Sequence, residues 1–189
     1  DVPEGNEQID RENRFLWRMN SRRVEGEVIR DSILHVTGHL DHSLGGPEIP
    51  LEEAETSRRR SVYFRHAHER KTAFLEIFDS ADVLDCYRRS ITIVPQQALA
   101  LANSELPYVE SRRLAETLTA QSTGKADADF VRLAFEHLLT RQSTAAELER
   151  CLEFLNRSAP PTQNQDPALH ARAGVIHALM NHSDFITIR

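Results

Sequence analysis

Long apolar runs are missing from this 189-residue sequence, and their absence excludes a membrane-spanning helix, which needs about 20 consecutive apolar residues. Glycine and proline are sparse as well, at seven and eight residues, which is too few for a low-complexity linker. The 40% of hydrophobic and 28% of charged residues are typical of one soluble globular domain. A chain of this length buries enough surface to fold without disulfides or a structural metal.

Lysine is nearly absent. Lys71 and Lys125 are the only two among 23 basic residues, so arginine supplies the rest. Guanidinium groups suit paired contacts to carboxylate, sulfate-like or phosphate-like anions, although a biased genomic base composition would give the same excess. The net charge of -6 argues against a nucleic-acid partner, which requires a broad basic surface.

Cysteine and the common catalytic motifs are also scarce. Cys86 and Cys151 form no Cys-x-x-Cys pair and no haem-attachment motif, so we predict two free core thiols. The sequence contains no Gly-x-Ser-x-Gly, Walker, Gly-x-Gly-x-x-Gly or His-Glu-x-x-His motif, and no cofactor is predicted. The first residue is aspartate rather than methionine, which suggests an interior piece of a longer product.

Helical periodicity in the first half is clearest at residues 23–37, where apolar side chains gather on one side and Gly38 is placed to end the helix. A loop at 43–50 and a mobile acidic stretch at 51–56 are expected to follow. Residues 72–78 indicate a short helix. Residues 61–65 and 91–94 are rich in β-branched or aromatic side chains, typical of short extended segments or one small pairing.

The second half predicts helices with clear starts. An Ala/Leu-rich stretch covers 97–103, Ser104 is placed to cap the next helix, and Asp127 begins another. Thr144 and Glu147 have the spacing of a capping box, and Asp166 with Pro167 opens the last helix. Residues 158–165 predict a loop, and 185–188 an extended tail.

We therefore predict a mainly α fold in a single domain over 1–189, with at most one small two-stranded pairing. Residues 1–95 form an irregular, polar half. Residues 96–189 form an antiparallel helix bundle, because their connections are short.

Several motifs follow one another along the chain. They begin with Asp-Arg-Glu-Asn-Arg-Phe-Leu-Trp-Arg-Met-Asn at 10–20 and Gly-Gly-Pro at 45–47, and continue with Arg-Arg-Ser-Val-Tyr at 59–63, Phe-Asp at 78–79 and Arg-Ser-Ile-Thr-Ile-Val-Pro-Gln-Gln-Ala-Leu at 89–99. In this order they resemble a planctomycete domain of unknown function found at the C-terminal end of large exported proteins.

The resemblance implies that the chain is the C-terminal portion of a larger domain. It also implies partner domains upstream in the same polypeptide, some with a c-type cytochrome module, and an exported location in the cell envelope or periplasm. The setting suggests work on complex or sulfated polysaccharides.

The candidate site is a set of arginine, acidic and amide side chains. Between Ser57 and Lys71 there are six basic residues and one acid, which makes a local positive field in an acidic protein. Such a set fits an anionic ligand, although an internal salt-bridge network would use the same residues. The predicted ligand-binding residues are Arg30, Asp31, Arg59, Arg60, Arg70, Asp79, Arg89, Gln97 and Asn103, with Asp82 and Thr92 nearby in sequence.

Three histidines, His35, His39 and His42, have a spacing that would suit zinc on a continuous helix. Gly38 interrupts that helix, so we predict exposed loop histidines and no metal. Asp79 and Asp82 could serve a glycosidase as paired carboxylates, but turn and capping roles fit them better.

Two functions remain open. The favoured one is a non-catalytic helical module that packs against an upstream domain and scaffolds or binds anionic, possibly sulfated, polysaccharide. The alternative is part of the active site of a polysaccharide-degrading hydrolase that missing upstream residues complete, with Arg60, Arg89 and Asp79 supplying charge or acid–base action.

Overall fold

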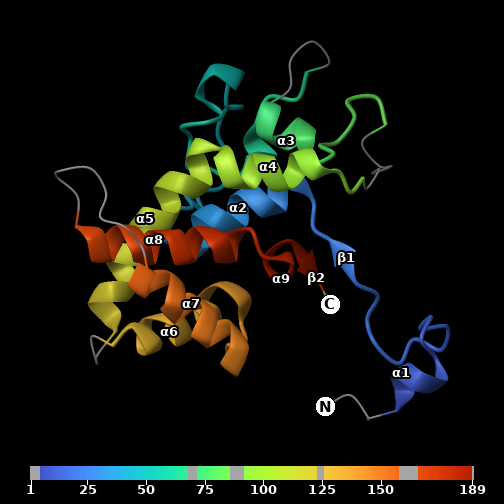
Figure 1. Cartoon of the computed structure of the whole chain (residues 1–189). Helices are drawn as coiled ribbons and strands as arrows, with labels where there is room; N and C mark the ends of the chain where they lie inside the picture. Colours follow the sequence, from blue (N-terminus) through green and yellow to red (C-terminus); the bar gives the residue numbers. More distant parts are fainter. Residues whose placement is uncertain (1–4, 68–71, 86–91, 123–125, 158–165, 189) are drawn as a thin grey trace.

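The computed structural model describes residues 5–67, 72–85, 92–122, 126–157 and 166–188. In these ranges the fold is mainly α, as predicted (Figure 1). The helices are α1 (Asn6–Ile9), α2 (Gly26–Val36), α3 (Ala73–Ile77), α4 (Pro95–Asn103), α5 (Glu105–Gln121), α6 (Asp127–Leu139), α7 (Ala145–Arg157), α8 (Pro167–Met180) and α9 (Ser183–Ile186), with the 3-10 turns η1 (Leu51–Glu53) and η2 (Ser61–Tyr63). The strands are β1 (Arg22–Arg23) and β2 (Thr187–Ile188).

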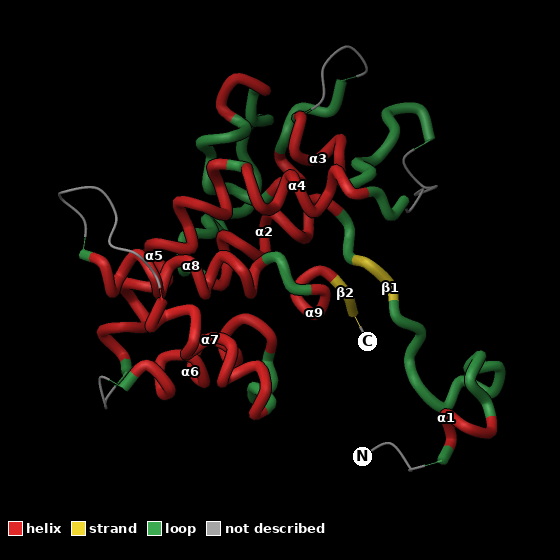
Figure 2. The backbone as a smooth tube through the Cα atoms, in the orientation of Figure 1, coloured by secondary structure: helices red, strands yellow, loops and turns green. Residues whose placement is uncertain are grey.

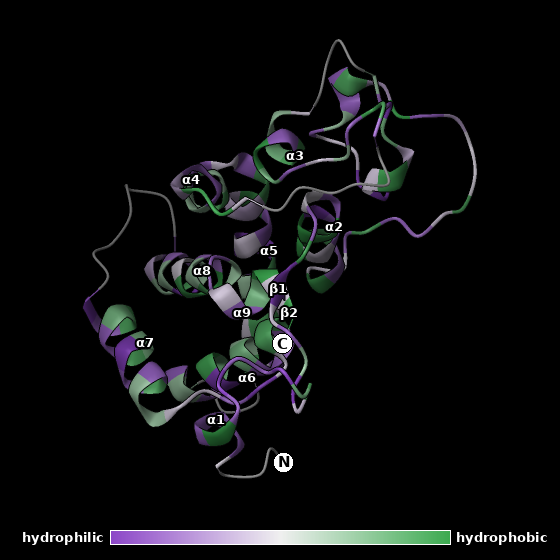
Figure 3. Cartoon of the chain, turned by 90° about the vertical axis from the view of Figure 1, so that its right-hand side faces the viewer, coloured by the Kyte–Doolittle hydropathy of each residue, from purple (hydrophilic) through white to green (hydrophobic). Residues whose placement is uncertain are grey.

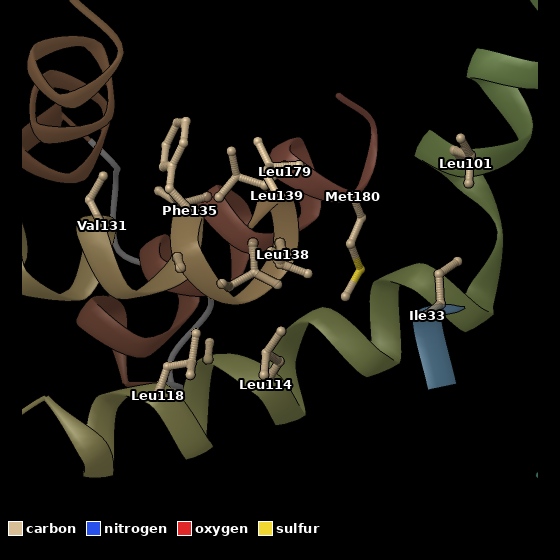
Figure 4. Close-up of a cluster of buried hydrophobic side chains, with 14 of the residues drawn as sticks. Ile33, Leu101, Leu114, Leu118, Val131, Phe135, Leu138, Leu139, Leu179 and Met180 are labelled. Atoms are coloured by element: carbon tan, nitrogen blue, oxygen red, sulfur yellow. The ribbon is translucent and has the colours of Figure 1, made fainter. Parts of the chain in front are cut away.

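The second half is a helix bundle. Helices α5 and α8 lie side by side, and α6 and α7 cover one end of that pair (Figure 1). Their apolar faces meet in one core, in which Leu114 and Leu118 of α5 lie near Leu138 of α6, with Met180 of α8 close by (Figure 4). Phe130 and Phe135 are buried in the same core.

Two helix starts follow the capping signals in the sequence, whereas Ser104 before α5 makes no side-chain capping bond and its hydroxyl donates to the Ala100 carbonyl instead. The Thr144 hydroxyl accepts a hydrogen bond from the Glu147 amide at 3.2 Å, and the Glu147 carboxylate accepts one from the Thr144 amide at 2.8 Å. Asp166 accepts from the Ala168 amide at 3.0 Å. The two bonds between Thr144 and Glu147 are reciprocal, and the bond to Asp166 is a single one. All three satisfy amides at a helix start that lack a partner within the helix, so the predicted starts of α7 and α8 are confirmed.

Helix α2 joins the irregular first half to the bundle. Its residues Ile29 and Ile33 are fully buried in the common core, and α2 also contacts α3 and η2 of the loop-rich first half (Figure 2). Hydrophobic and hydrophilic residues both occur along α2, as an amphipathic helix requires (Figure 3). The helix ends at Val36, and Gly38 follows with a φ of 74°, which confirms the predicted left-handed glycine.

The expected extended segments are confirmed only in part: Phe64 is extended and forms an isolated parallel bridge with Ile49, and Val94 is extended, but the described residues of neither segment form a regular strand. Residues 61–63 form the turn η2, and Thr92–Val94 lies outside any strand, whereas Ile91 is outside the described residues. A small antiparallel pairing exists, but Arg22 with Ile188 and Arg23 with Thr187 make it. This pairing joins residues that are more than 160 positions apart in the sequence, so no local pattern could indicate which segments pair. The stretch 51–56, expected to be mobile, contains η1 and the buried Ala54.

Residues 5–21 form an arm that stands away from the bundle (Figure 1). Hydrogen bonds within the arm fix its loop: the Asp10 carboxylate accepts from the amides of Arg14 at 2.9 Å and Phe15 at 2.8 Å, and its carbonyl accepts from Trp17 Nε1 at 2.8 Å. The loop exposes 84% of Phe15 and 72% of Leu16.

None of the helices in the described part of the chain is long and apolar enough to cross a lipid bilayer.

Candidate functional site

Arg30 on α2 is the best-anchored charge in the first half. Only 3% of it is exposed, and its two terminal nitrogens donate to the carbonyls of Ala54 at 3.4 Å, Arg59 at 3.0 Å and Ser57. Its guanidinium also lies over the Phe64 ring, 4.5 Å from the centroid. Burial lowers the pKa of Arg30, and the neighbouring carboxylate of Asp31 opposes that effect. Arg30 therefore fixes the backbone of 54–61 against α2.

Asp31 completes this anchor. Its carboxylate accepts hydrogen bonds from the Ser61 amide at 2.9 Å and the Ser61 hydroxyl at 2.7 Å. The first residue of η2 is thus capped by a side chain from another helix, which explains why residues 61–63 turn before the chain extends at Phe64. Ile49 holds the other end of this segment, since its carbonyl accepts from the Arg65 amide at 2.9 Å.

An open cleft of about 750 Å³ lies beside this anchor. Four segments form its walls: one side of α2 with the residues before it, the loop 40–44, the segment 60–66, and residues 72–81. Val28, Phe64 and Leu75 contribute apolar surface to the lining. The cleft is therefore large enough for a ligand of a few sugar rings or for a small molecule.

Arginines and histidines line the same cleft. Arg60 is exposed, and its side chain makes no hydrogen bond or ion pair with the described residues. Arg65 has one exposed, distant ion pair, with Glu48 at 3.8 Å. His35 and His42 meet edge to face with ring centroids 5.7 Å apart, and His66 also lines the cleft. The carboxylates that line the cleft belong to Glu25, Glu27 and Asp31.

A second polar cluster joins β1, α3 and α4. Arg23 pairs with the Asp79 carboxylate at 2.5 Å and also donates to Gln97. Asp79 accepts from the amide and the hydroxyl of Thr92, each at 2.8 Å. Burial opposes ionisation of Asp79, but the bonds from Thr92 and Arg23 outweigh it and hold its pKa below the ordinary value. Gln97 donates to the Ile77 carbonyl at 3.0 Å. This cluster ties the three elements together through its own contacts, although the buried Nε of Arg23 has no hydrogen-bond partner among the described residues.

The structure thus divides the predicted site residues. Arg60 and Asp31 line the cleft and Arg30 supports it from below, whereas Asp79 and Gln97 belong to the second cluster. The other predicted residues that the structure describes lie elsewhere. Arg59 stacks on Tyr63 and donates to Gly45 and Pro47, Asn103 donates to Leu99 at the end of α4, Asp82 accepts from the Leu84 amide in a turn, and Arg70 and Arg89 are outside the described residues.

Of the three histidines considered for zinc, His39 lies apart from the contacting pair His35 and His42. His39 turns to α5, where its Nδ1 lies 2.5 Å from the buried Glu110 carboxylate. Burial opposes ionisation of Glu110, yet the contacts with His39, Thr37 and Arg113 hold its pKa below the ordinary value. No group of three histidine, cysteine or acidic side chains in the described residues is placed to hold a metal ion.

The sequence did not single out Arg65 or His66 as site residues. The only sequence feature that pointed to them was the basic, aromatic stretch after Ser57. Their position beside α2 depends on contacts between residues far apart in the sequence, which no local pattern indicates. Cys151 on α7 is a free, half-buried thiol, and burial raises its pKa. Cys86 lies outside the described residues.

Residues 1–155 match the family described as protein of unknown function DUF1553, also named PSD1. The chain belongs to this family. The match covers the arm, the cleft and the second cluster, and it ends within α7. Every residue of the candidate site therefore lies in the part of the chain that matches the family. It confirms the resemblance to a domain of unknown function. No curated protein and no solved structure matches the chain.

Proposed function

We propose that this DUF1553 domain is a non-catalytic helical module that binds an anionic, sulfated polysaccharide in the cleft beside α2. The observation that carries the proposal is Arg60. Its guanidinium faces the cleft and has no partner among the described residues. The guanidinium of Arg30 on α2, by contrast, is fully engaged in structural contacts. An unpaired guanidinium offers two parallel donors to a sulfate group.

The other walls of the cleft fit a sugar. Val28 and Leu44 are exposed and provide apolar surface against which the C–H face of a ring packs, and Arg65 and His66 add donors on the same wall as Arg60. The backbone that carries these donors is pinned by Arg30 and Asp31. A donor set held in place before the ligand arrives loses little conformational entropy on binding.

The arm supports a role for a partner domain upstream in the same polypeptide. Its internal hydrogen bonds keep Phe15 and Leu16 exposed, and Leu16 has a strained, left-handed backbone with a φ of 54°. A rigid loop that presents apolar side chains is typical of a protein contact. We also propose that the protein is exported to the cell envelope or periplasm, where such polysaccharides occur.

The alternative, part of a hydrolase active site completed by other residues, has less support. Asp79 would have to donate or accept a proton, but its carboxylate is held by Arg23 and Thr92 and its pKa is lowered. A general acid at neutral pH needs a raised pKa. Asp79 also lies in the second cluster and is not part of the cleft lining.

The test is calorimetry with a sulfated oligosaccharide and its desulfated counterpart. We expect the wild type to bind the sulfated ligand, and Arg60→Ala to weaken that binding about tenfold or more, since a charged hydrogen bond contributes about 1.5–3 kcal/mol. Arg150→Ala is the matched control, because Arg150 is an exposed arginine on α7, away from the cleft. Equal binding of both ligands, or equal losses in both variants, would contradict the proposal.

A further inference from the structure

We infer that the cleft is an acid-strengthened site, in which protonation of His35, His42 and His66 adds the positive charge that holds a sulfate ester. The inference rests on the proposed function and specifies its dependence on pH. It stands on the convergence of three imidazoles from three segments, α2, the loop 40–44 and the segment 60–66, on one cavity. Imidazole is the side chain that ordinarily changes charge between about pH 5 and 8.

Fixed charges of both signs line the cleft around these histidines. From α2 and the residue before it, Glu25, Glu27 and Asp31 face the cleft. Asp31 is paired at 3.3 Å with the buried Arg30, so its charge is largely compensated. From the segment 60–66 come Arg60 and Arg65.

The other two walls add little fixed charge. Asp41 adjoins His42 in the loop, and its carboxylate accepts from the Ser43 amide at 2.8 Å. The lining residues from 72–81 are Thr72, Leu75, Ser80 and Ala81, which carry no titratable group. Among the described lining residues, the histidines are therefore the groups that can add positive charge as the pH falls.

Two of the histidines should respond together. The rings of His35 and His42 are 5.7 Å apart, so one sulfate group can lie against both rings. A bound sulfate favours the charged form of a neighbouring imidazole because opposite charges attract. Binding near neutral pH should therefore take up protons from the buffer.

The size of the effect follows from Coulomb's law. A unit charge about 6 Å from a sulfate in water strengthens binding by about threefold, so three histidines together give about 30-fold. Sulfate esters stay ionised over this pH range, so the change comes from the protein. The expected result is binding at least tenfold tighter at about pH 5.5 than at about pH 7.5.

The experiment compares the wild type with the triple variant His35→Gln/His42→Gln/His66→Gln, using the same sulfated oligosaccharide. Calorimetry in two buffers of different ionisation enthalpy counts the protons taken up. His170→Gln is the control, because His170 is an exposed histidine on α8 outside this cleft. Circular dichroism at both pH values verifies that each variant is folded.

We expect proton uptake and acid strengthening in the wild type and in His170→Gln, and their loss in the triple variant. Equal affinity at both pH values in the wild type would overturn the inference and leave the proposed function standing. An equal acid response in the triple variant would also overturn it. Absence of binding at either pH would overturn the proposed function itself.

Discussion

Replacing Arg30 by alanine should destabilise the domain more than any exposed arginine substitution does. The change removes the donors to the carbonyls of Ala54, Ser57 and Arg59 and leaves Asp31 without its buried counter-charge. Breaking a buried pair in this way costs about 3–5 kcal/mol. For a domain of this size, each kcal/mol lowers the melting temperature by about 2–4 °C.

The assay is urea denaturation followed by circular dichroism, with Arg58→Ala as the control. Arg58 is exposed on the same segment, so its loss should change the free energy of unfolding by about 0.5 kcal/mol or less. A double variant, Arg30→Met/Asp31→Asn, should recover part of the loss because it removes both charges. If Arg30→Ala costs less than about 1 kcal/mol, Arg30 does not anchor the cleft, and the reasoning fails.

Three further predictions concern other parts of the fold. Hydrogen bonds from Arg141 lower the pKa of Glu147 from 4.5 to about 2, so the stability that this ionised group contributes is complete above pH 4.5 and is lost as the pH falls toward 2; acid titration of the melting temperature should show a smaller loss over that range in Glu147→Gln. Gly26→Ala should destabilise by about 1–3 kcal/mol, because the new Cβ would lie 2.8 Å from Phe78 Cβ; an unchanged melting temperature would refute this close contact. Phe15→Ser should leave the free energy of unfolding within about 0.5 kcal/mol, since the side chain is exposed; a large loss measured by urea denaturation would show that the arm packs on the body.

The sequence predicted the bundle well because its signals are local. The capping box at Thr144 and the Asp166–Pro167 pair mark helix starts through bonds between residues two or three positions apart. The apolar period of α6 likewise depends only on neighbours along the helix. Such elements keep their predicted bounds within a few residues.

The first half was harder because distant residues determine its conformation. The segment 61–65 has strand-forming side chains, but Asp31 captures Ser61 and produces a turn. Arg30 and Arg59 look alike in the sequence, yet one is buried against five polar atoms and the other stacks on Tyr63. No local sequence pattern distinguishes the buried arginine from the stacked one.

The candidate site shows the same limit. Reasoning from sequence found Arg60 through the basic stretch after Ser57, and it noted the histidines without assigning them to a common place. Asp79 pairs with Arg23, which lies 56 positions away in the sequence, so this predicted acid is not free to act on a ligand. Which charges remain available to a ligand depends on such long-range pairs.

The most direct test of the account is a nuclear magnetic resonance titration of the folded chain with a sulfated oligosaccharide at about pH 5.5, where imidazoles carry charge. The account predicts that the largest shifts fall on the Arg60 side chain, on the rings of His35 and His66, and on the amides of residues 40–44. Shifts concentrated instead on the groove between α5 and α8, around Tyr108 and His170, would contradict it.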